Sequence, residues 1–190
     1  MFNVSEDTQL VKGFLPASFA AELFTQIHDQ TAWHRQVRSQ EDGTPVPLRR
    51  AMAYAADQVS DYHYAKLVLP GQGWSEPLLA IRHELEARTA YSFNSVLLNL
   101  YRNGKDVIQW HADKEAQLGP TPVIATVNLG ATRHFHFRAM DDYANQSSVQ
   151  LENGDLLLML ENCQQHFQHA ILREKEVTEP RISLTFRHVY

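Results

Sequence analysis

Apolar residues in the first ninety positions of the chain recur with the period of amphipathic helices. Two stretches, residues 17–30 and 75–89, place large apolar side chains three or four positions apart, which aligns them on one helix face. The two stripes consist of Phe19, Leu23, Phe24 and Ile27, and of Leu78, Ile81 and Leu85. These patterns predict a helix over each stretch. Residues 35–70 are polar and interrupted by prolines, which favours loops and short strands.

After about residue 90, the pattern changes to one that is typical of β-strands. Residues 133–138 alternate polar and aromatic side chains, as expected of a strand with one buried face. Runs rich in β-forming residues predict further strands at 93–101, 107–111, 122–129, 155–160, 168–172 and 181–189. Asn153-Gly154 is a typical hairpin turn before one of these runs. At least seven strands, with two helices packed on one sheet, predict a mainly β fold, a sandwich or jelly roll.

Composition fits one soluble globular domain. The 190 residues are 44% hydrophobic and 21% charged, which is ordinary for such a domain. A net charge of −5 argues against a generally basic surface, so a polyanion would need local positive charge. The first residues lack a secretory pattern, no apolar run is long enough to span a membrane, and the single Cys163 excludes an internal disulfide. We therefore expect a cytoplasmic location, or a nuclear one in a eukaryotic cell.

One short motif has the spacing of a metal site, His111-Ala112-Asp113, whereas nucleotide-binding, nucleophile-elbow and paired-cysteine motifs are absent from the sequence. Side chains two apart on a strand point to the same side and can reach one metal ion. His169, on a later predicted strand, supplies a third ligand. Two histidines and one carboxylate form the facial triad of non-haem Fe(II) oxygenases. Taken alone, the motif is also compatible with a solvated strand end.

Polar residues on two further predicted strands suit a dicarboxylic acid. Arg181 and Arg187 are six apart, so they share one strand face with Ser183. The planar guanidinium group matches a carboxylate, and two of them beside a metal suit a dicarboxylic acid. Asn99 and Tyr101 add an amide and a phenol to one face of the strand before the metal motif.

The combined order N-x-Y, H-x-D, H and R-x5-R resembles that of the AlkB family of Fe(II)- and 2-oxoglutarate-dependent oxygenases, especially its human-type DNA repair branch. The matching blocks are 93–104, 110–115, 130–135, 156–159 with Gln164 and His169, and 179–190, with a weaker match at 48–54. The resemblance implies a single domain over 1–190. Within it, a double-stranded β-helix core at about 91–190 follows N-terminal helices and a nucleotide-recognition lid at about 1–90.

For the metal, the resemblance implies Fe(II) held by His111, Asp113 and His169, with 2-oxoglutarate and O2 as cosubstrates. The implied reaction is oxidative demethylation of N-methylated bases in DNA or RNA. The expected substrates are 1-methyladenine and 3-methylcytosine, and the products include formaldehyde and succinate. No membrane partner is expected, and the chain is expected to act as a monomer.

For the cosubstrate, the resemblance implies that Tyr101 and Arg181 hold the distal carboxylate of 2-oxoglutarate. It places Asn99 and Arg187 near the metal-chelating end. Ser183 stands where the family often has Asn, and its hydroxyl is expected to replace that hydrogen bond.

For the substrate, the resemblance places Glu115 at the edge of the base, where a carboxylate suits a cationic methylated lesion. A base must leave its stack to reach a buried metal, and this requires a stacking aromatic ring. Tyr64 is the candidate for that ring, and Tyr54 and Tyr62 are neighbours that can share the role. Cations expected near the pocket mouth, available for phosphate contacts, are Arg35, Arg38, Arg49, Arg50, Arg102 and Lys105.

Two alternatives remain open at this stage. The same oxygenase chemistry on a protein, lipid or small molecule fits the acidic net charge. A jelly-roll binding module without catalysis is a second alternative, although it would not need the complete ligand set. Leu48 stands where the family usually has Pro, and Ala55 where it usually has Gly. The preference for DNA or RNA, single- or double-stranded, therefore stays open.

Overall fold

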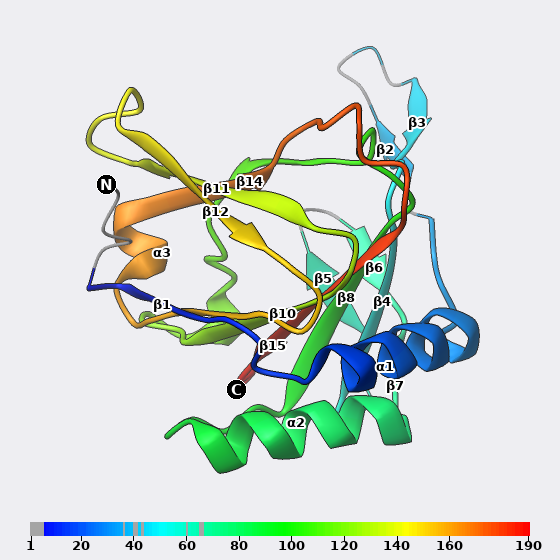
Figure 1. Cartoon of the computed structure of the whole chain (residues 1–190). Coiled ribbons are helices and arrows are strands. Elements are labelled where there is room, and N and C mark those ends of the chain that lie inside the picture. Colours follow the sequence, from blue (N-terminus) through cyan, green and yellow to red (C-terminus); the bar gives the residue numbers. More distant parts are fainter. Residues whose placement is uncertain (1–5, 36, 40–41, 43, 60, 65–66) are drawn as a thin grey trace.

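Two β-sheets face each other in the structure, a computed structural model that describes residues 6–35, 37–39, 42, 44–59, 61–64 and 67–190 (Figure 1). The major sheet has seven strands in the order β1-β13-β10-β15-β8-β4-β7, and the minor sheet has four in the order β12-β11-β14-β9. Apolar side chains of both sheets meet in one buried cluster between them. This arrangement confirms the predicted mainly β, jelly-roll fold.

The strands and helices have the following bounds. The major sheet contains β1 (Thr8–Val11), β4 (Ala51–Ala56), β7 (Gly71–Gln72), β8 (Ser95–Tyr101), β10 (Ile124–Gly130), β13 (Leu156–Met159) and β15 (Arg181–Arg187). The minor sheet contains β9 (Ile108–His111), β11 (Arg133–Ala139), β12 (Gln146–Leu151) and β14 (Phe167–Ile171). Two further strand pairs are β2 (Val37–Ser39) with β3 (Pro45–Pro47), and β5 (Tyr62–Tyr64) with β6 (Leu67–Leu69). The helices are α1 (Ala17–Gln30), α2 (Glu76–Arg88), α3 (Cys163–His166) and the 3-10 helix η1 (Ala116–Leu118).

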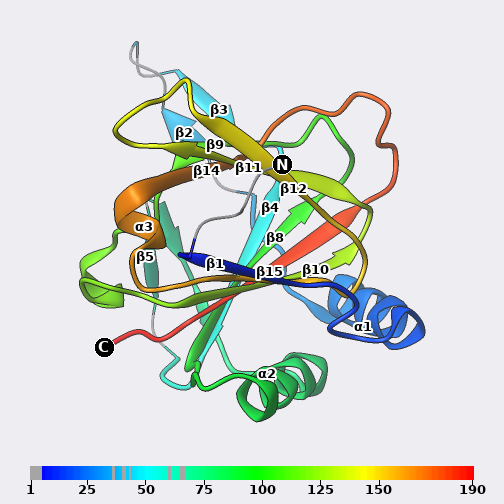
Figure 2. The same ribbon diagram turned by 60° about the vertical axis from the view of Figure 1, so that its left-hand side comes forward.

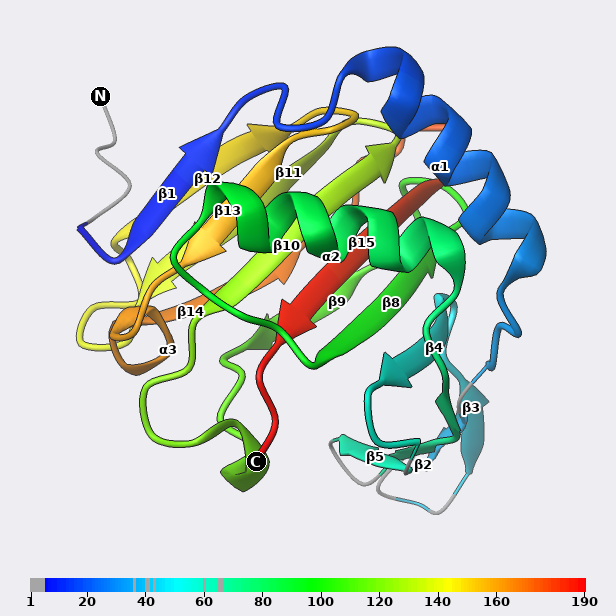
Figure 3. The same cartoon turned by 90° about the horizontal axis from the view of Figure 1, so that it is seen from below.

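Helices α1 and α2 cover the outer face of the major sheet (Figure 3), so the molecule has three layers, with the minor sheet opposite the helices (Figure 2). Their bounds agree with the helices predicted at 17–30 and 75–89. Leu23, Ile27 and Ile81, from the two predicted stripes, are buried in the cluster between the helices and the sheet. Among the described helices, none has the length and apolar character needed to cross a membrane.

Alternation along β15 separates its apolar from its polar side chains. Ile182, Leu184 and Phe186 belong to the cluster under the helices. Ser183, Thr185 and Arg187 point the other way and line a cavity between the two sheets. The period of two residues therefore delivers polar groups to the interior and apolar groups to the helix layer.

Strand β4 is an element that the sequence pattern did not single out. It lies in the region expected to contain loops and short strands, yet all six of its residues are buried and it pairs with β8 along its length. Four of the six are alanines, which are poor strand formers and weaken the pattern. Ala51, Ala53 and Ala55 face the helix layer, where small side chains allow close packing. Strands from the first ninety residues thus extend the major sheet.

The predicted hairpin at Asn153-Gly154 is wrong in its pairing, although the turn exists. It joins β12 of the minor sheet to β13 of the major sheet, so the two flanking strands do not pair. Asn153 accepts a hydrogen bond from the Gly130 amide through Oδ1, at 2.9 Å. Gly154 has φ +87°, and a Cβ there would lie 2.4 Å from the carbonyl oxygen of Leu15. The turn therefore carries the chain between the sheets and anchors the segment before α1.

Candidate metal centre

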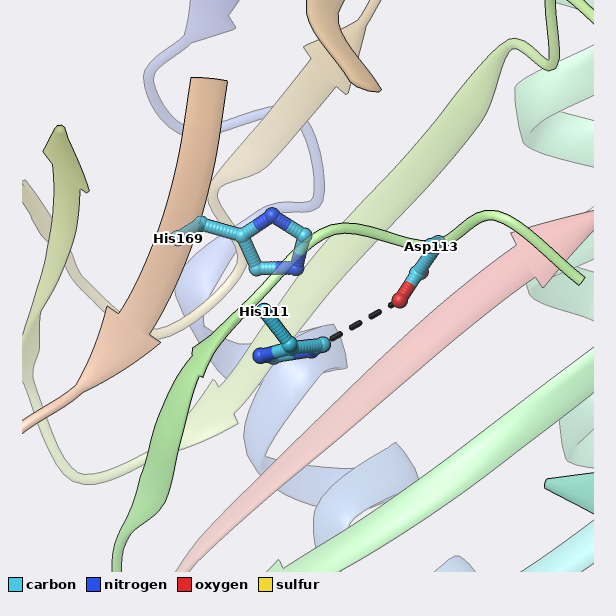
Figure 4. Close-up of side chains that lie close together, drawn as sticks. All are labelled: His111, Asp113 and His169. Carbon is cyan, nitrogen blue, oxygen red and sulfur yellow. Dashed lines mark ion pairs between the residues drawn. The ribbon is translucent and has the colours of Figure 1, made fainter. Parts of the chain in front are cut away.

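The three residues predicted to bind a metal lie together on neighbouring segments of the minor sheet (Figure 4). His111 at the end of β9 pairs directly with His169 of β14, and their ring centroids are 4.2 Å apart. Asp113 follows β9, and its Oδ1 is 3.6 Å from Nε2 of His111. One potential ligand atom from each residue lies within 4.8 Å of the others. The strand pairing therefore creates the cluster that the sequence predicted.

The carboxylate of Asp113 is buried, and its two oxygens have different surroundings. Oδ2 accepts a hydrogen bond from Nη2 of Arg187 at 2.5 Å. Burial opposes the charged form, but the charge of Arg187, and then the neighbouring His169 and His111, lower the pKa of Asp113 to about 2. Within the described part of the chain, Oδ1 has no hydrogen-bond partner. A buried, charged oxygen without a hydrogen-bond partner is costly, and beside two imidazoles it suits a metal ion.

Both histidines have surroundings that suit a metal ligand. Nδ1 of His111 donates to the carbonyl oxygen of Gln109 at 2.7 Å, and Nε2 lies on the side of Asp113. This second hydrogen bond is typical of metal-binding histidines. Burial, and then the neighbouring His111, lower the pKa of His169 to about 3. The donor set of two imidazoles and one carboxylate therefore fits Fe(II).

Gln164 forms a hydrogen bond with Asp113, although the sequence assigned it no role. Its Oε1 accepts a hydrogen bond from the Asp113 backbone amide at 2.9 Å, and its side chain is buried. Gln164 lies in α3, directly before the strand that carries His169. Gln164 thus links the segment that carries Asp113 to the segment that carries His169. In the sequence, its position in a block that matches the family was the one sign of this role.

The residues predicted to bind a dicarboxylic acid lie on β8 and β15, which pair side by side. Register places Arg181 opposite Tyr101 and Ser183 opposite Asn99. Nε of Arg181 donates to Oδ1 of Asn128, and Nη2 donates to Oγ of Ser183 at 3.4 Å. The guanidinium of Arg181 also lies 5.0 Å from the centre of the Tyr101 ring.

Arg181 retains unused hydrogen-bonding capacity. It is 1% exposed, and burial lowers its pKa to about 10. Its Nη1 has no hydrogen-bond partner in the described ranges of the chain. A buried guanidinium with a free N–H favours a carboxylate ligand, because an unpaired charge in the interior is costly. The residues present therefore fit a dicarboxylic acid such as 2-oxoglutarate.

A second buried arginine, Arg133, supports this end of the site and was missed by the sequence analysis. It is bound to Glu174 at 2.8 Å and to three backbone carbonyls, and its guanidinium lies 5.8 Å from the Tyr101 ring centre. The signal was present, since Arg133 shares the inward face of its strand with Phe135 and Phe137.

Arg50 does not lie where the sequence analysis placed it. It is 7% exposed and lines the same cavity as the three metal-ligand candidates, so the structure gives no support for a surface contact with phosphate. Its Nε donates to Oδ1 of Asn99 at 2.9 Å. The cavity also contains Ser183 and Arg187. Arg50 therefore belongs to the interior of the site.

The tyrosines predicted to stack a base differ in position. Tyr54 and Tyr62 are 4% and 1% exposed and stack on each other with ring centroids 4.5 Å apart. Oη of Tyr62 accepts a hydrogen bond from Nη1 of Arg187 at 2.8 Å, and burial raises the pKa of Tyr62 to about 12. A base would reach these rings only after movement of the surrounding segment. The side chain of Tyr64 lies outside the described part of the chain.

Glu115 is half-buried near Asp113. Burial and the charge of Asp113 raise the pKa of Glu115. Among the described residues, its Oε2 has no hydrogen-bond partner. This oxygen is available to a ligand that carries a hydrogen-bond donor or a positive charge.

The remaining predicted cations are mostly at the surface. Arg102 is bound to Asp106 at 2.9 Å, and the side chain of Arg38 is outside the described residues. The exposed cations are Arg35, Arg49 and Lys105. Leu48, at one of the positions that depart from the family pattern, packs against the apolar cluster that contains Tyr54 and Tyr62, and Ala55 is buried.

The sequence matches a known family over nearly its whole length. Residues 7–187 match the model described as the 2OG-Fe(II) oxygenase superfamily. The chain is 35% identical over 190 residues to "Alpha-ketoglutarate-dependent dioxygenase alkB homolog 3" from Bos taurus. This match covers 95% of the present chain and 65% of the bovine protein. It is 32% identical over 179 residues to "DNA oxidative demethylase ALKBH2" from Homo sapiens, covering 90% and 69%. The chain thus spans 65% of the length of the first of these relatives.

Solved structures share the fold at low sequence identity. OsALKBH1 matches with a TM-score of 0.67 and 18% identity, over 98% of this chain and all of that chain. A prolyl-4-hydroxylase from Pseudomonas putida matches with a TM-score of 0.58 and 16% identity, over 97% and 94%.

Proposed function

Because the chain belongs to the 2OG-Fe(II) oxygenase superfamily and has AlkB-type relatives, we propose that it removes methyl groups oxidatively from alkylated nucleic-acid bases. One observation carries this proposal. A single cavity between the sheets holds the His111, Asp113 and His169 cluster together with the predicted 2-oxoglutarate residues Asn99 and Arg187. Metal and cosubstrate would therefore be adjacent.

The proposed cofactor is Fe(II), held by His111, Asp113 and His169, with 2-oxoglutarate and O2 as cosubstrates. When bound, the metal would activate O2: one oxygen atom would go to succinate as 2-oxoglutarate loses CO2, and the other would hydroxylate the N-methyl carbon. The hydroxymethyl product then breaks down to formaldehyde and the repaired base. Arg187 keeps Asp113 charged and oriented as a ligand. The proposed lesions are 1-methyladenine and 3-methylcytosine.

At the cosubstrate, we assign the distal carboxylate to Arg181 and Tyr101, supported by the free Nη1 of Arg181. Ser183 contributes a hydroxyl beside that guanidinium. Asn99 and Arg187 lie toward the metal-chelating end.

At the substrate, we assign the base edge to Glu115, because its carboxylate oxygen without a hydrogen-bond partner in the described chain suits a cationic lesion. The lesion must be extruded from its strand to reach the cavity. Tyr64 remains the proposed stacking ring, with Tyr54 and Tyr62 behind it. Exposed Arg49 supplies phosphate contact at the mouth.

The decisive test is a panel of methylated oligonucleotides, DNA and RNA, each single- and double-stranded. We expect formaldehyde release from 1-methyladenine or 3-methylcytosine that requires both Fe(II) and 2-oxoglutarate. His111→Ala should reduce turnover by at least a hundred-fold, because a triad without one ligand holds the metal poorly. Succinate formation without formaldehyde from any oligonucleotide would instead indicate a protein, lipid or small-molecule substrate.

We also infer one domain over residues 1–190, acting as a monomer in the cytoplasm or the nucleus. The continuous major sheet, built from strands of both halves of the chain, supports the single domain. Light scattering of the purified protein would give its mass in solution.

A further inference from the structure

Arg50 is a buried positive charge inside the cavity of the metal cluster. It directly precedes β4, the strand that the sequence pattern did not single out, and is 7% exposed. Its Nε donates to Oδ1 of Asn99 at 2.9 Å, and its Nη1 lies 3.4 Å from the carbonyl oxygen of Val107. Both acceptors are neutral.

No carboxylate pairs with Arg50 in the part of the chain that the structure describes. Two other inward arginines of the site differ in this respect, since Arg187 is paired with Asp113 and Arg133 with Glu174. Arg181 resembles Arg50, because in the described residues it donates to the neutral side chains of Asn128 and Ser183. Burying a guanidinium without an anion is costly, so the position calls for an anionic partner that enters the cavity.

The contact with Asn99 has a consequence for that side chain. With Oδ1 engaged by Arg50, the Asn99 amide is fixed in one of its two orientations. It then offers its Nδ2 hydrogens, which are donors, to other groups. Donors suit a carboxylate, whereas the free oxygen of the opposite orientation would repel one.

We propose that Arg50 positions 2-oxoglutarate: it fixes the Asn99 amide as a donor and adds a positive charge beside the bound dianion. This inference rests on the proposed function, because it assumes that 2-oxoglutarate enters this cavity. The methylated base is a poorer candidate for the partner, since 1-methyladenine and 3-methylcytosine are cations and would be repelled by a guanidinium.

Calorimetric titration of 2-oxoglutarate into Mn(II)-loaded protein measures this role without turnover. Arg50→Met removes charge and donor, Arg50→Gln keeps a donor, and Arg50→Lys keeps the charge. We expect affinity to fall about ten-fold or more in Arg50→Met, and less in Arg50→Lys, because charged hydrogen bonds are worth that much. The matched control is Arg173→Met, an exposed arginine to which no role is assigned.

Thermal unfolding separates positioning from a structural role. Without ligands, Arg50→Met should unfold at the same temperature as the wild type or higher, because an uncompensated charge has been removed. Only the upward shift caused by 2-oxoglutarate should shrink. If Arg50→Met does not fold, the affinities of Arg50→Lys and Arg50→Gln for 2-oxoglutarate test the role of Arg50 in its place.

Steady-state kinetics distinguish a role of Arg50 in binding 2-oxoglutarate from a role in binding the oligonucleotide. The KM for 2-oxoglutarate should rise in the Arg50 variants, while the KM for a methylated oligonucleotide stays constant. Binding of 2-oxoglutarate by the variants within two-fold of wild type would overturn the role of Arg50. Failure of the wild-type protein itself to bind 2-oxoglutarate would instead overturn the proposed function.

Discussion

At the residue scale, the site depends on polar atoms that the fold buries without satisfying them. Oδ1 of Asp113 and Nη1 of Arg181 have no hydrogen-bond partner among the residues described. Each of these side chains has a second atom held by a close hydrogen bond: Oδ2 of Asp113 by Arg187, and Nε of Arg181 by Asn128. One atom thus fixes the side chain and the other is left for a ligand. Such a division of roles preorganises a site.

Burial also determines the chemistry of Cys163, which is 1% exposed. Burial, and then the charges of Asp7 and Asp113, raise the pKa of its thiol from 9.0 to about 12. We therefore predict that the folded protein resists alkylation by iodoacetamide at pH 8, because the thiolate is the nucleophile. Full reaction should appear on denaturation, and since Cys163 is the single cysteine, the signal is unambiguous.

The same shift predicts a change of stability with pH. Above pH 9 the unfolded chain loses the thiol proton, whereas the folded chain keeps it until about pH 12. The free energy of unfolding should therefore fall as pH rises above 9, by at most about 1.4 kcal/mol per pH unit from this group. Urea unfolding at several pH values measures the slope. An identical slope in Cys163→Ala would contradict the assignment.

At the element scale, the sequence predicted the helices and strands whose apolar residues recur with a regular period. The helices at 17–30 and 75–89, and the strands after residue 90, follow from apolar spacing, and the H-x-D motif at the end of a strand located the metal cluster. Strand β4 was missed because alanine carries little strand signal. The burial of Arg50, which directly precedes that strand, was not predicted. The turn at Asn153-Gly154 was assigned to a hairpin, since a two-residue turn does not encode which sheet its neighbours join.

The short helix α3 matters for the metal through Gln164. We predict that Gln164→Leu lowers metal affinity about ten- to a hundred-fold, as is usual when a residue that orients a ligand is lost. The substitution keeps the volume but leaves the buried amide of Asp113 without its acceptor. Titration with Co(II), followed by visible absorption, measures affinity and geometry together.

Gln165→Leu is the matched control for this change. Gln165 is the next residue of α3, is exposed, and donates to the carbonyl oxygen of Pro120 at 3.3 Å. Equal loss of Co(II) affinity in both variants would show that the helix as a whole matters, and not the contact of Gln164 with Asp113.

At the scale of the whole molecule, charge would limit how the chain holds nucleic acid, its proposed substrate. The net charge is −5, and of the predicted cations near the mouth only Arg35, Arg49 and Lys105 are exposed in the described residues without an acidic partner. Phosphate contacts should therefore be few. On the proposed function, the cavity would select the methylated base, and the surface cations would add only modest attraction for the phosphates.

This distribution predicts a weak dependence of binding on salt. For two or three phosphate contacts, the slope of log K against log salt should be about −2 for single strands. Arg49→Ala should make the slope shallower by about 0.7, whereas exposed Arg173→Ala should leave it unchanged. Fluorescence anisotropy with a labelled single strand between 50 and 200 mM salt provides the measurement. A slope steeper than about −5 would require contacts that these residues do not supply.

The central position of β15 has a consequence for synthesis. β15 is the last strand of this chain, yet it lies between β10 and β8 in the middle of the major sheet. On a ribosome, which delivers residues in order, β10 and β8 each lack one of their two partner strands until β15 has emerged. Between the synthesis of β10 and that of β15, the nascent chain therefore exposes one unpaired edge on each of β8 and β10, and such edges favour aggregation.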